Sequence, residues 1–215
     1  MMSFRVIMKS DLAPLERDLF DDKGFLRVMP YDYYKQVPQD VLHYFAHEYG
    51  IYVFPTVEMI EWFRENMEGI AIEIGAGHGA LGRALDIPIT DSRMHELPEI
   101  KLYYELIHLP TIKYPGDVEK LDAEEAITKY QPDTVIGGYI IERWRPNYEQ
   151  GHHLGVNEHD IIKRTKKYML ILNKHDHPDK WLYHSPHQEH KFEWIVTRSK
   201  HKDNRICVWN GRSIR

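Results

Sequence analysis

The sequence predicts an α/β fold in which helices cover a mostly parallel sheet, with a helical extension at the N-terminus. Two observations support this prediction. Residues 70–74 form a short, almost entirely apolar run that ends in glycines, which is typical of a parallel strand buried on both faces. From there to residue 173, strand-like and helix-like segments alternate, and this is the pattern of β–α–β units whose strands run parallel.

Residues 1–68 are predicted to form the helical extension, as part of the same domain. Pro38 opens a segment with apolar residues at helical spacing, and that helix is expected to end before Gly50. A second helix is expected to follow Thr56, whose hydroxyl suits an N-cap, and to run to Met67.

Residues 69–215 are expected to form the sheet and its covering helices. In chain order we predict strands at 70–74, 87–90, 111–114, 134–139 and 168–173, and helices at 80–85, 96–109, 122–130 and 158–167. Two later apolar segments, 192–198 and 205–209, flank a turn-prone stretch and predict an antiparallel hairpin.

The composition is that of an ordinary globular chain. Of the 215 residues, 42% are hydrophobic and 28% are charged, which is enough to build a core and excludes a mainly disordered protein. Apolar runs are far shorter than the roughly 20 residues that a membrane span requires. The N-terminal residues mix acids and bases with apolar residues, unlike a signal peptide. We therefore expect a soluble, cytoplasmic protein with no membrane partner.

Charge is distributed unevenly along the chain. The formal net charge is -5, yet the segment from Ile161 onward holds 13 Lys and Arg against 5 Asp and Glu. This basic third leaves a contact with nucleic acid open without favouring it, because no block of five basic residues occurs. The single cysteine, Cys207, excludes an internal disulfide and a cysteine-rich zinc site.

One motif carries most of the functional information. Residues 73–82, EIGAGHGALG, follow the strand at 70–74 and open a helix. Glycines there allow a sharp turn and let a ligand approach the backbone without meeting a Cβ atom. Asp91 ends the next predicted strand, where a carboxylate suits hydrogen bonds from ribose hydroxyls. The context predicts a site for a nucleotide-type cofactor.

Two cofactors fit these residues. Gly75, Gly77 and Ala80 satisfy the dinucleotide pattern G-x-G-x-x-A, which leaves NAD and an oxidoreductase open. With Glu73, the loop becomes E-x-G-x-G-x-G, which resembles the first motif of class I S-adenosylmethionine-dependent methyltransferases. The resemblance extends over residues 69–209 through Asp91, the turn at 116–118 and the terminal hairpin.

The resemblance implies a Rossmann-like, three-layer sheet of about seven strands, mostly parallel, with an antiparallel strand from the C-terminal hairpin. It also implies binding of S-adenosylmethionine and S-adenosylhomocysteine. In that resemblance Glu73 orients the site and Asp91 binds the ribose. The remaining implied cofactor contacts are Gly75, Ala76, Gly77 and Gly79 to the methionine end, and Asp117 and Val118 to the adenine.

The methyl acceptor is not identified by the sequence. The fourth predicted strand ends in Gly137-Gly138-Tyr139, without the prolines of enzymes that methylate exocyclic amino groups of DNA bases, and Cys207 is not preceded by the proline of C5-cytosine enzymes. The polar segment that follows supplies the candidates. Its candidate bases are Glu142, His152 and His153. Tyr139 and Trp144 are the candidate walls of the acceptor pocket. In the fold that the resemblance implies, His175, just after the fifth predicted strand, can reach that pocket.

Fourteen histidines, five of them between residues 175 and 190, raise the question of a metal. Pro178 and Pro186 interrupt this segment and no helical His-Glu-x-x-His occurs, so we expect none. A third functional alternative is a non-catalytic or atypical S-adenosylmethionine binder, which the unusual end of the fourth strand favours. The sequence alone does not choose among the three.

Overall fold

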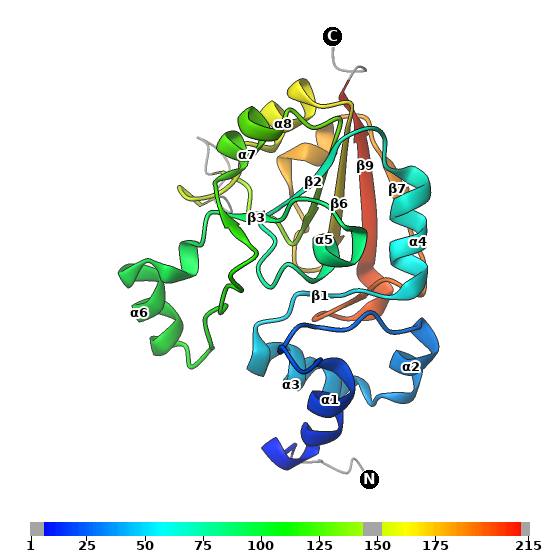
Figure 1. Ribbon diagram of the computed structural model, residues 1–215, viewed down its shortest axis with the longest axis vertical. Helices are drawn as coiled ribbons and strands as arrows, with labels where there is room; N and C mark the ends of the chain where they lie inside the picture. The colour runs from blue at the N-terminus through cyan, green and yellow to red at the C-terminus, as the bar shows by residue number, and fades with distance from the viewer. Residues whose placement is uncertain (1–6, 144–151, 212–215) are drawn as a thin grey trace.

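A five-stranded mixed sheet lies at the centre of the molecule (Figure 1). The computed structural model describes residues 7–143 and 152–211. The strands are β2 (Ala71–Ile74), β5 (Thr134–Gly138), β6 (Lys167–Asn173), β9 (Asn204–Asn210) and β7 (Gln188–His190), adjacent in that order. The first three run parallel, and β9 runs antiparallel to both β6 and β7. The predicted α/β class is therefore confirmed.

A second sheet of two parallel strands, β3 (Thr90–Asp91) and β4 (Glu119–Lys120), lies beside β2. The backbone N–H of Glu73 donates to the carbonyl of Pro88 at 2.9 Å, and that of Ala76 donates to Thr90 at 3.1 Å. An isolated parallel bridge also joins Glu73 to Ile89. The two sheets are thus linked through β2 and β3.

Side chains along the central strands alternate between two helical layers. Tyr168, Leu170 and Leu172 pack in the cluster that contains α7 (Ala123–Tyr130) and α8 (Glu158–Arg164). Met169 and Ile171 face the other way, into the cluster with α4 (Val57–Asn66) and α5 (Ala80–Leu85). This period-2 alternation of a fully buried strand produces the three layers.

The N-terminal residues form a third cluster of buried side chains. It contains α1 (Ala13–Leu19), α2 (Tyr31–Gln36) and α3 (Gln39–Tyr49), preceded by the short helix η1 (Lys9–Asp11). The helix predicted after Pro38 is confirmed as α3, which Gly50 ends at a φ of 62°. The N-cap of α4 is confirmed as well, because the Thr56 hydroxyl accepts the N–H of Met59 at 3.1 Å.

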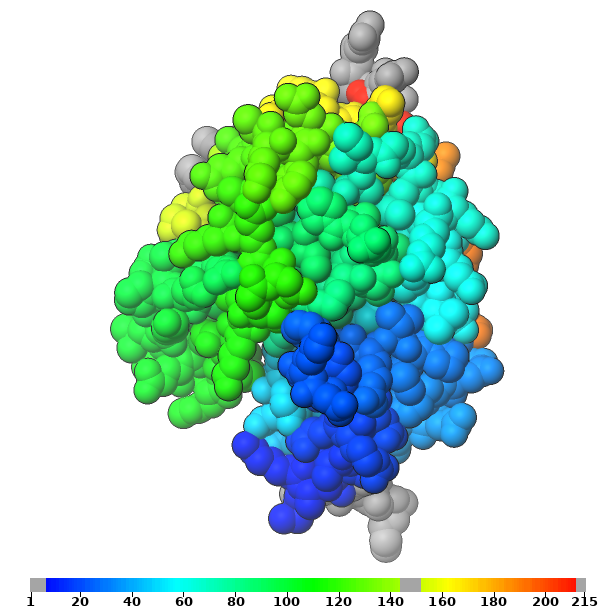
Figure 2. Space-filling view, in the orientation of Figure 1, coloured from blue at the N-terminus to red at the C-terminus, as the bar shows by residue number. Residues whose placement is uncertain are grey.

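Six further elements complete the described part of the chain. They are β1 (Val53–Phe54), η2 (Met94–Glu96), α6 (Pro98–Leu106), η3 (Trp181–His184), β8 (Val196–Thr197) and η4 (His201–Asp203). On the face seen in Figure 2, the surface is indented between the green segment that includes α6 and the blue N-terminal helices. Across the described part of the chain, no helix has the length and apolar character to cross a membrane.

The strand predicted at 111–114 is wrong. These residues have no regular secondary structure, and the strand at this place in the chain is β4, five residues after Tyr114. The reason is visible at Ile112, whose backbone N–H donates to the ring nitrogen Nδ1 of His95 at 3.1 Å instead of to a neighbouring strand. Pro110 and Pro115, which lack an N–H, flank the segment.

The predicted hairpin of 192–198 with 205–209 is also wrong in its pairing. Within 192–198, only β8 is a strand, and it pairs with β1 of the N-terminal extension. The antiparallel neighbours of β9 are β6 and β7 instead. Phe192 and Trp194 stack on each other at 4.4 Å and pack near Trp62 of α4, so tertiary packing competes with the local hairpin.

Candidate functional site

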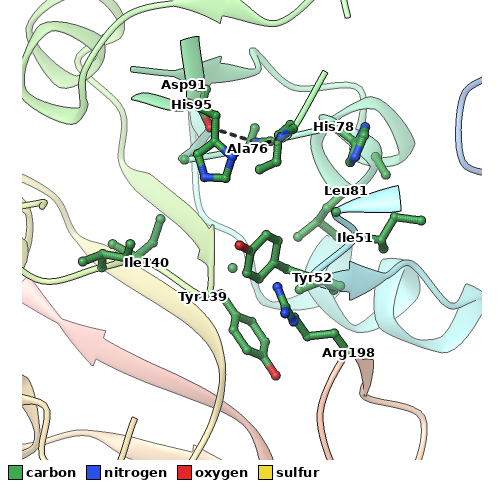
Figure 3. Close-up of a pocket in the computed structure, with 18 of the residues that line it drawn as sticks. Ile51, Tyr52, Ala76, His78, Leu81, Asp91, His95, Tyr139, Ile140 and Arg198 are labelled. Carbon is green, nitrogen blue, oxygen red and sulfur yellow. Dashed lines mark hydrogen bonds between the residues drawn. The ribbon is translucent and has the colours of Figure 1, made fainter. Parts of the chain in front are cut away.

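A cavity of about 460 Å³ opens where the parallel strands β2, β3, β5 and β6 end (Figure 3). Most of its lining comes from six parts of the chain: residues 47–53, the glycine turn after β2, the segment 91–114, residues 138–141 at the end of β5, the loop that carries His177 and the loop that carries Arg198. In α/β proteins, ligands bind at this edge of the sheet.

The glycine turn forms one wall. Gly75, Gly77 and Gly79 have φ values of 55°, 54° and 66°, in the left-handed region that favours glycine. A Cβ atom on Gly75 would lie 2.5 Å from Cδ1 of Ile140, which also lines the cavity. Gly75, Ala76 and Gly77 line the cavity, whereas Gly79 lies behind them as the N-cap of α5.

Asp91, at the end of β3, holds this turn in place. Its Oδ2 accepts the backbone N–H of Gly77 at 2.9 Å, and its Oδ1 accepts that of Arg93 at 2.6 Å. Burial raises the pKa of Asp91, while these two backbone hydrogen bonds and the Tyr114 hydroxyl act in the opposite direction. The carboxylate therefore lines the cavity in a fixed orientation.

Glu73 of β2 fastens the other end of the turn. Its Oε2 accepts the backbone N–H of Gly82 in α5 at 2.7 Å. The side chain is only 4% exposed, and this burial raises its pKa to about 8. Glu73 is thus mainly protonated at neutral pH, and it positions the turn without placing a negative charge beside it.

Two histidines close the wall above the turn. Nε2 of His78 lies 2.7 Å from the carbonyl of Tyr49, which ties the turn to α3. Nδ1 of His95 accepts from Ile112, and burial lowers the pKa of His95 to about 4. Both histidines line the cavity, and His95 is uncharged at neutral pH.

The opposite end of the cavity is aromatic and basic. Tyr52 and Tyr139 have ring centroids 5.6 Å apart, and the Arg198 guanidinium lies over the Tyr52 ring at 4.5 Å (Figure 3). The His177 ring meets Tyr139 edge to face at 5.1 Å. Tyr139 was predicted from the sequence as a pocket wall, and it does line this cavity.

Asp117 and Val118, the predicted adenine contacts, do not line the cavity. The Asp117 carboxylate receives two hydrogen bonds from the Arg83 guanidinium, at 2.8 and 2.9 Å, and Arg83 lowers the pKa of Asp117. Val118 is fully buried, and one of its methyl groups would lie 3.0 Å from a Cβ on Gly79. The turn that carries them comes before β4 and not after a strand.

The residues predicted as bases also lie outside the cavity lining. Glu142 is buried elsewhere and its Oε2 accepts the N–H of Trp181 at 3.1 Å. The rings of His152 and His153 lie against each other, tilted by 33°, with centroids 4.3 Å apart. His175 is exposed, although its neighbours Asp176 and His177 line the cavity, and Trp144 falls outside the described residues.

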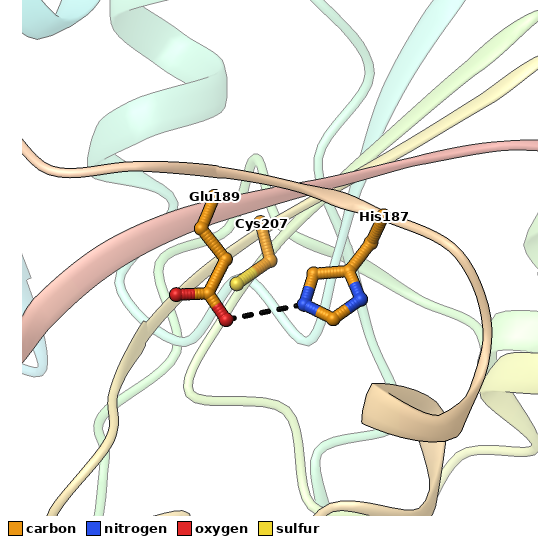
Figure 4. A group of neighbouring side chains, drawn as sticks. All are labelled: His187, Glu189 and Cys207. Atoms are coloured by element: carbon orange, nitrogen blue, oxygen red, sulfur yellow. Dashed lines mark hydrogen bonds and ion pairs between the residues drawn. The ribbon is translucent and has the colours of Figure 1, made fainter.

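One group of side chains has the spacing of a metal site among the residues that the structure covers. Ligand atoms of His187, Glu189 and Cys207 lie within 4.8 Å of one another on β9 and the segment around β7 (Figure 4). Glu189 already forms an ion pair with Lys174 and lies 4.0 Å from Arg205. Burial raises the pKa of the Cys207 thiol to about 12, which disfavours the thiolate that a metal needs.

Tyr52, His78, His95, His177 and Arg198 line the cavity but are not among the predicted site residues. His78 lies within the glycine motif, and His177 within the histidine-rich segment after the fifth strand, so a signal existed for both. Tyr52 is one of six tyrosines in the N-terminal part that could cover the cofactor or stack on a substrate, although packing against the core is the favoured interpretation for most of them. No local pattern marks His95 or Arg198. These three residues come from segments that precede or follow the predicted site and reach it only through tertiary packing.

No protein-family model matches the sequence, and no curated protein does. Solved structures do match. Precorrin-6y C5,15-methyltransferase from Geobacter metallireducens is similar at 13% identity and a TM-score of 0.36, over 72% of this chain and 89% of that one. The MTase domain of METTL16 is similar at 15% identity and a TM-score of 0.40, over 92% and 89%.

A third similar structure is a tRNA (uracil-54, C5)-methyltransferase from Pyrococcus abyssi in complex with S-adenosyl-L-homocysteine. The identity is 13% and the TM-score 0.34, over 71% of this chain but only 36% of that protein. With identities of 13–15%, these similarities do not define a family for this chain.

Proposed function

We propose that the protein is an S-adenosylmethionine-dependent methyltransferase whose cofactor binds at the glycine turn. One observation carries the proposal: the turn after β2 and the carboxylate at the end of β3 line the same cavity, at the carboxyl edge of parallel strands. This pairing of exposed backbone with a fixed acid suits an adenosyl compound with an amino-acid end.

The residues that line the cavity fit S-adenosylmethionine. Glycine at positions 75 and 77 leaves the backbone open to a ligand, and a Cβ at position 75 would collide with Ile140. The cavity volume of about 460 Å³ lies within the range of small-molecule sites, about 300–1,000 Å³. Gly75, Ala76 and Gly77 are assigned to the methionine end and Asp91 to the ribose, with Glu73 positioning the turn.

The strand arrangement supports the same proposal. If the two linked sheets are counted as one, the order is β4-β3-β2-β5-β6-β9-β7, and only β9 runs against its neighbours. A seven-stranded sheet with one reversed strand agrees with the methyltransferase resemblance, whereas an NAD-binding half would more often continue with a parallel strand. In this assignment residues 69–215 form the cofactor-binding part, and residues 1–68 supply one wall of the cavity.

The bound cofactor would supply an activated methyl group. Methyl transfer is an in-line displacement, so the chain has to orient the two reactants and remove a proton from the acceptor. The hydrogen bond from the N–H of Gly77 to Asp91 fixes the glycine turn, which would hold the cofactor in place. Ile51, Leu81 and Ile140 provide apolar walls that exclude water.

The test is calorimetric titration with S-adenosylmethionine, S-adenosylhomocysteine and NAD. Both adenosyl compounds should bind the wild type at micromolar concentration and Asp91→Ala much more weakly. Glu99→Ala, which removes an exposed acid of α6, is the matched control and should bind like the wild type. Binding of NAD alone, or of none of the three, would refute the proposal.

A second readout concerns catalysis. Mass spectrometry of cell extracts incubated with the protein and isotope-labelled S-adenosylmethionine should reveal one or more labelled products. Tight cofactor binding with no labelled product in any fraction would favour the non-catalytic binder.

A further inference from the structure

The end of the cavity away from the glycine turn is built around Tyr139. The rings of Tyr52 and His177 contact the ring of Tyr139. The Arg198 guanidinium lies over the ring of Tyr52 (Figure 3). The Tyr139 hydroxyl donates to Thr197 Oγ1 at 2.8 Å, which fixes the central ring. The proposed cofactor contacts use none of these side chains.

Arg198 offers a positive charge to this end. Its guanidinium donates to Nδ1 of His47 at 2.8 Å, and burial together with this guanidinium lowers the pKa of His47, so its partner is a neutral ring. Among the described residues no carboxylate forms an ion pair with Arg198. Asp176, also in the lining, accepts instead from the Ser199 hydroxyl. His47 contacts only the Nη2 group, so the three N–H donors on Nε and Nη1 are not used by it, and a planar fork of donors suits an oxyanion.

His177 offers a proton acceptor. Its Nδ1 lies 3.2 Å from the carbonyl of Asn173, and because a carbonyl can only accept, Nδ1 carries the proton and Nε2 keeps a lone pair. Burial and then the charge of Lys180 lower the pKa of His177, whereas Asp176 and Glu158 act in the opposite direction. The ring is therefore neutral at physiological pH.

We propose that this end of the cavity binds the methyl acceptor, and that the acceptor is a small molecule carrying an oxyanion, a carboxylate or a phosphate, held by Arg198. The proposal rests on the proposed function above. The O–H or N–H bond of the acceptor breaks, and its proton passes to Nε2 of His177. The electron pair released from that bond would form the new bond to the methyl carbon, and the carbon–sulfur bond of the cofactor would break with its own electron pair staying on sulfur.

The test uses 4-hydroxy-3-nitrobenzoate, whose phenol absorbs visible light when it ionises, with S-adenosylhomocysteine already bound. The wild type should bind this probe, and Arg198→Met should bind it roughly tenfold or more weakly, since hydrogen bonds to a charged group contribute about 1.5–3 kcal/mol. Lys202→Met removes an exposed cation from the same region and should bind like the wild type. Arg198→Lys, which keeps the charge, should retain part of the affinity.

Two analogues of the probe test the role of charge. 2-Nitrophenol lacks the carboxylate and should bind weakly, with no difference between the wild type and Arg198→Met. 4-Hydroxybenzoate and 4-hydroxyphenyl phosphate differ in carrying a carboxylate or a phosphate. Tighter binding of the first indicates that the acceptor carries a carboxylate, and tighter binding of the second indicates a phosphate.

Ionisation of the bound probe tests His177. At a pH below the pKa of the free phenol, the nitrophenolate band should rise on binding to the wild type and to His184→Gln, an exposed control, but not to His177→Gln. Equal affinity in Arg198→Met, equal ionisation in His177→Gln, or no binding of the probe to the protein with bound S-adenosylhomocysteine would each overturn the proposal while leaving the cofactor site intact. If S-adenosylhomocysteine itself does not bind, the proposed function fails first.

Discussion

The carboxylate of Asp91 accepts the backbone N–H of Gly77, 14 residues earlier in the chain, at 2.9 Å. One strand end therefore fixes the turn at the end of the neighbouring strand, and both face one cavity. A carboxylate that binds the turn and faces the ligand couples the two functions, because loss of the acid loosens the turn as well as removing a ligand contact.

Asp117 should matter far less than Asp91 for cofactor binding. Its carboxylate is paired with Arg83 outside the cavity lining. We expect Asp117→Ala to change the affinity for S-adenosylhomocysteine by less than about threefold, since an exposed ion pair contributes about 0–1 kcal/mol. Calorimetric titration of Asp117→Ala and Asp91→Ala with S-adenosylhomocysteine checks this. An equal loss of affinity in the two variants would show that Asp117 belongs to the cofactor site.

Gly75→Ala should destabilise the protein and abolish cofactor binding. The new methyl group would meet Ile140 at 2.5 Å, at a φ of 55° that disfavours any side chain. We expect a loss of about 1–3 kcal/mol in the free energy of unfolding, measured in urea. Gly116→Ala is the control, because nothing lies within 4 Å of the position that its new methyl group would take, and it should unfold like the wild type. A stable Gly75→Ala that binds cofactor would contradict the proposed site.

Glu73 should make stability fall as the pH rises. Its pKa in the folded protein is raised to about 8 by burial, from 4.5, so the folded state binds more protons than the unfolded state between these values. Glu73→Gln removes this titration. Its stability relative to the wild type should therefore increase with pH, by at most about 1.4 kcal/mol per pH unit. Urea unfolding at pH values between the two pKa values checks this, and parallel pH profiles would contradict it.

The buried pair of Lys180 and Glu158 should be strongly coupled. The two side chains are 2% and 0% exposed and form an ion pair, and Glu158 also accepts the Tyr168 hydroxyl at 2.7 Å. Lys180→Met would leave a buried carboxylate unpaired and should cost about 3–5 kcal/mol. The double variant Glu158→Leu/Lys180→Met should lose less than the sum of the single variants.

Lys163→Met is the control for this pair, because Lys163 is exposed on α8 and its loss should cost less than about 0.5 kcal/mol. Additive losses in the double variant, measured by urea unfolding, would show that the pair is not coupled.

Much of the fold follows from local pattern. Thr56 caps α4 as its hydroxyl predicts, Gly50 ends α3, and the apolar run at 70–74 becomes β2. Where the prediction is wrong, the segment takes its hydrogen-bond or strand partner from another part of the chain. Ile112 donates to His95 instead of to a strand, and β8 pairs with β1, more than 140 residues earlier in the chain.

The sequence by itself determined the α/β class, the glycine turn and the acid at the end of β3, because glycine conformation, strand burial and strand-end position are properties of short segments. The tertiary structure alone decided that Tyr52, His177 and Arg198 share a cavity with that turn. They belong to three separate segments, and no local preference specifies their contacts. Packing of the whole chain brings these segments together, since only the folded core fixes which segments become neighbours.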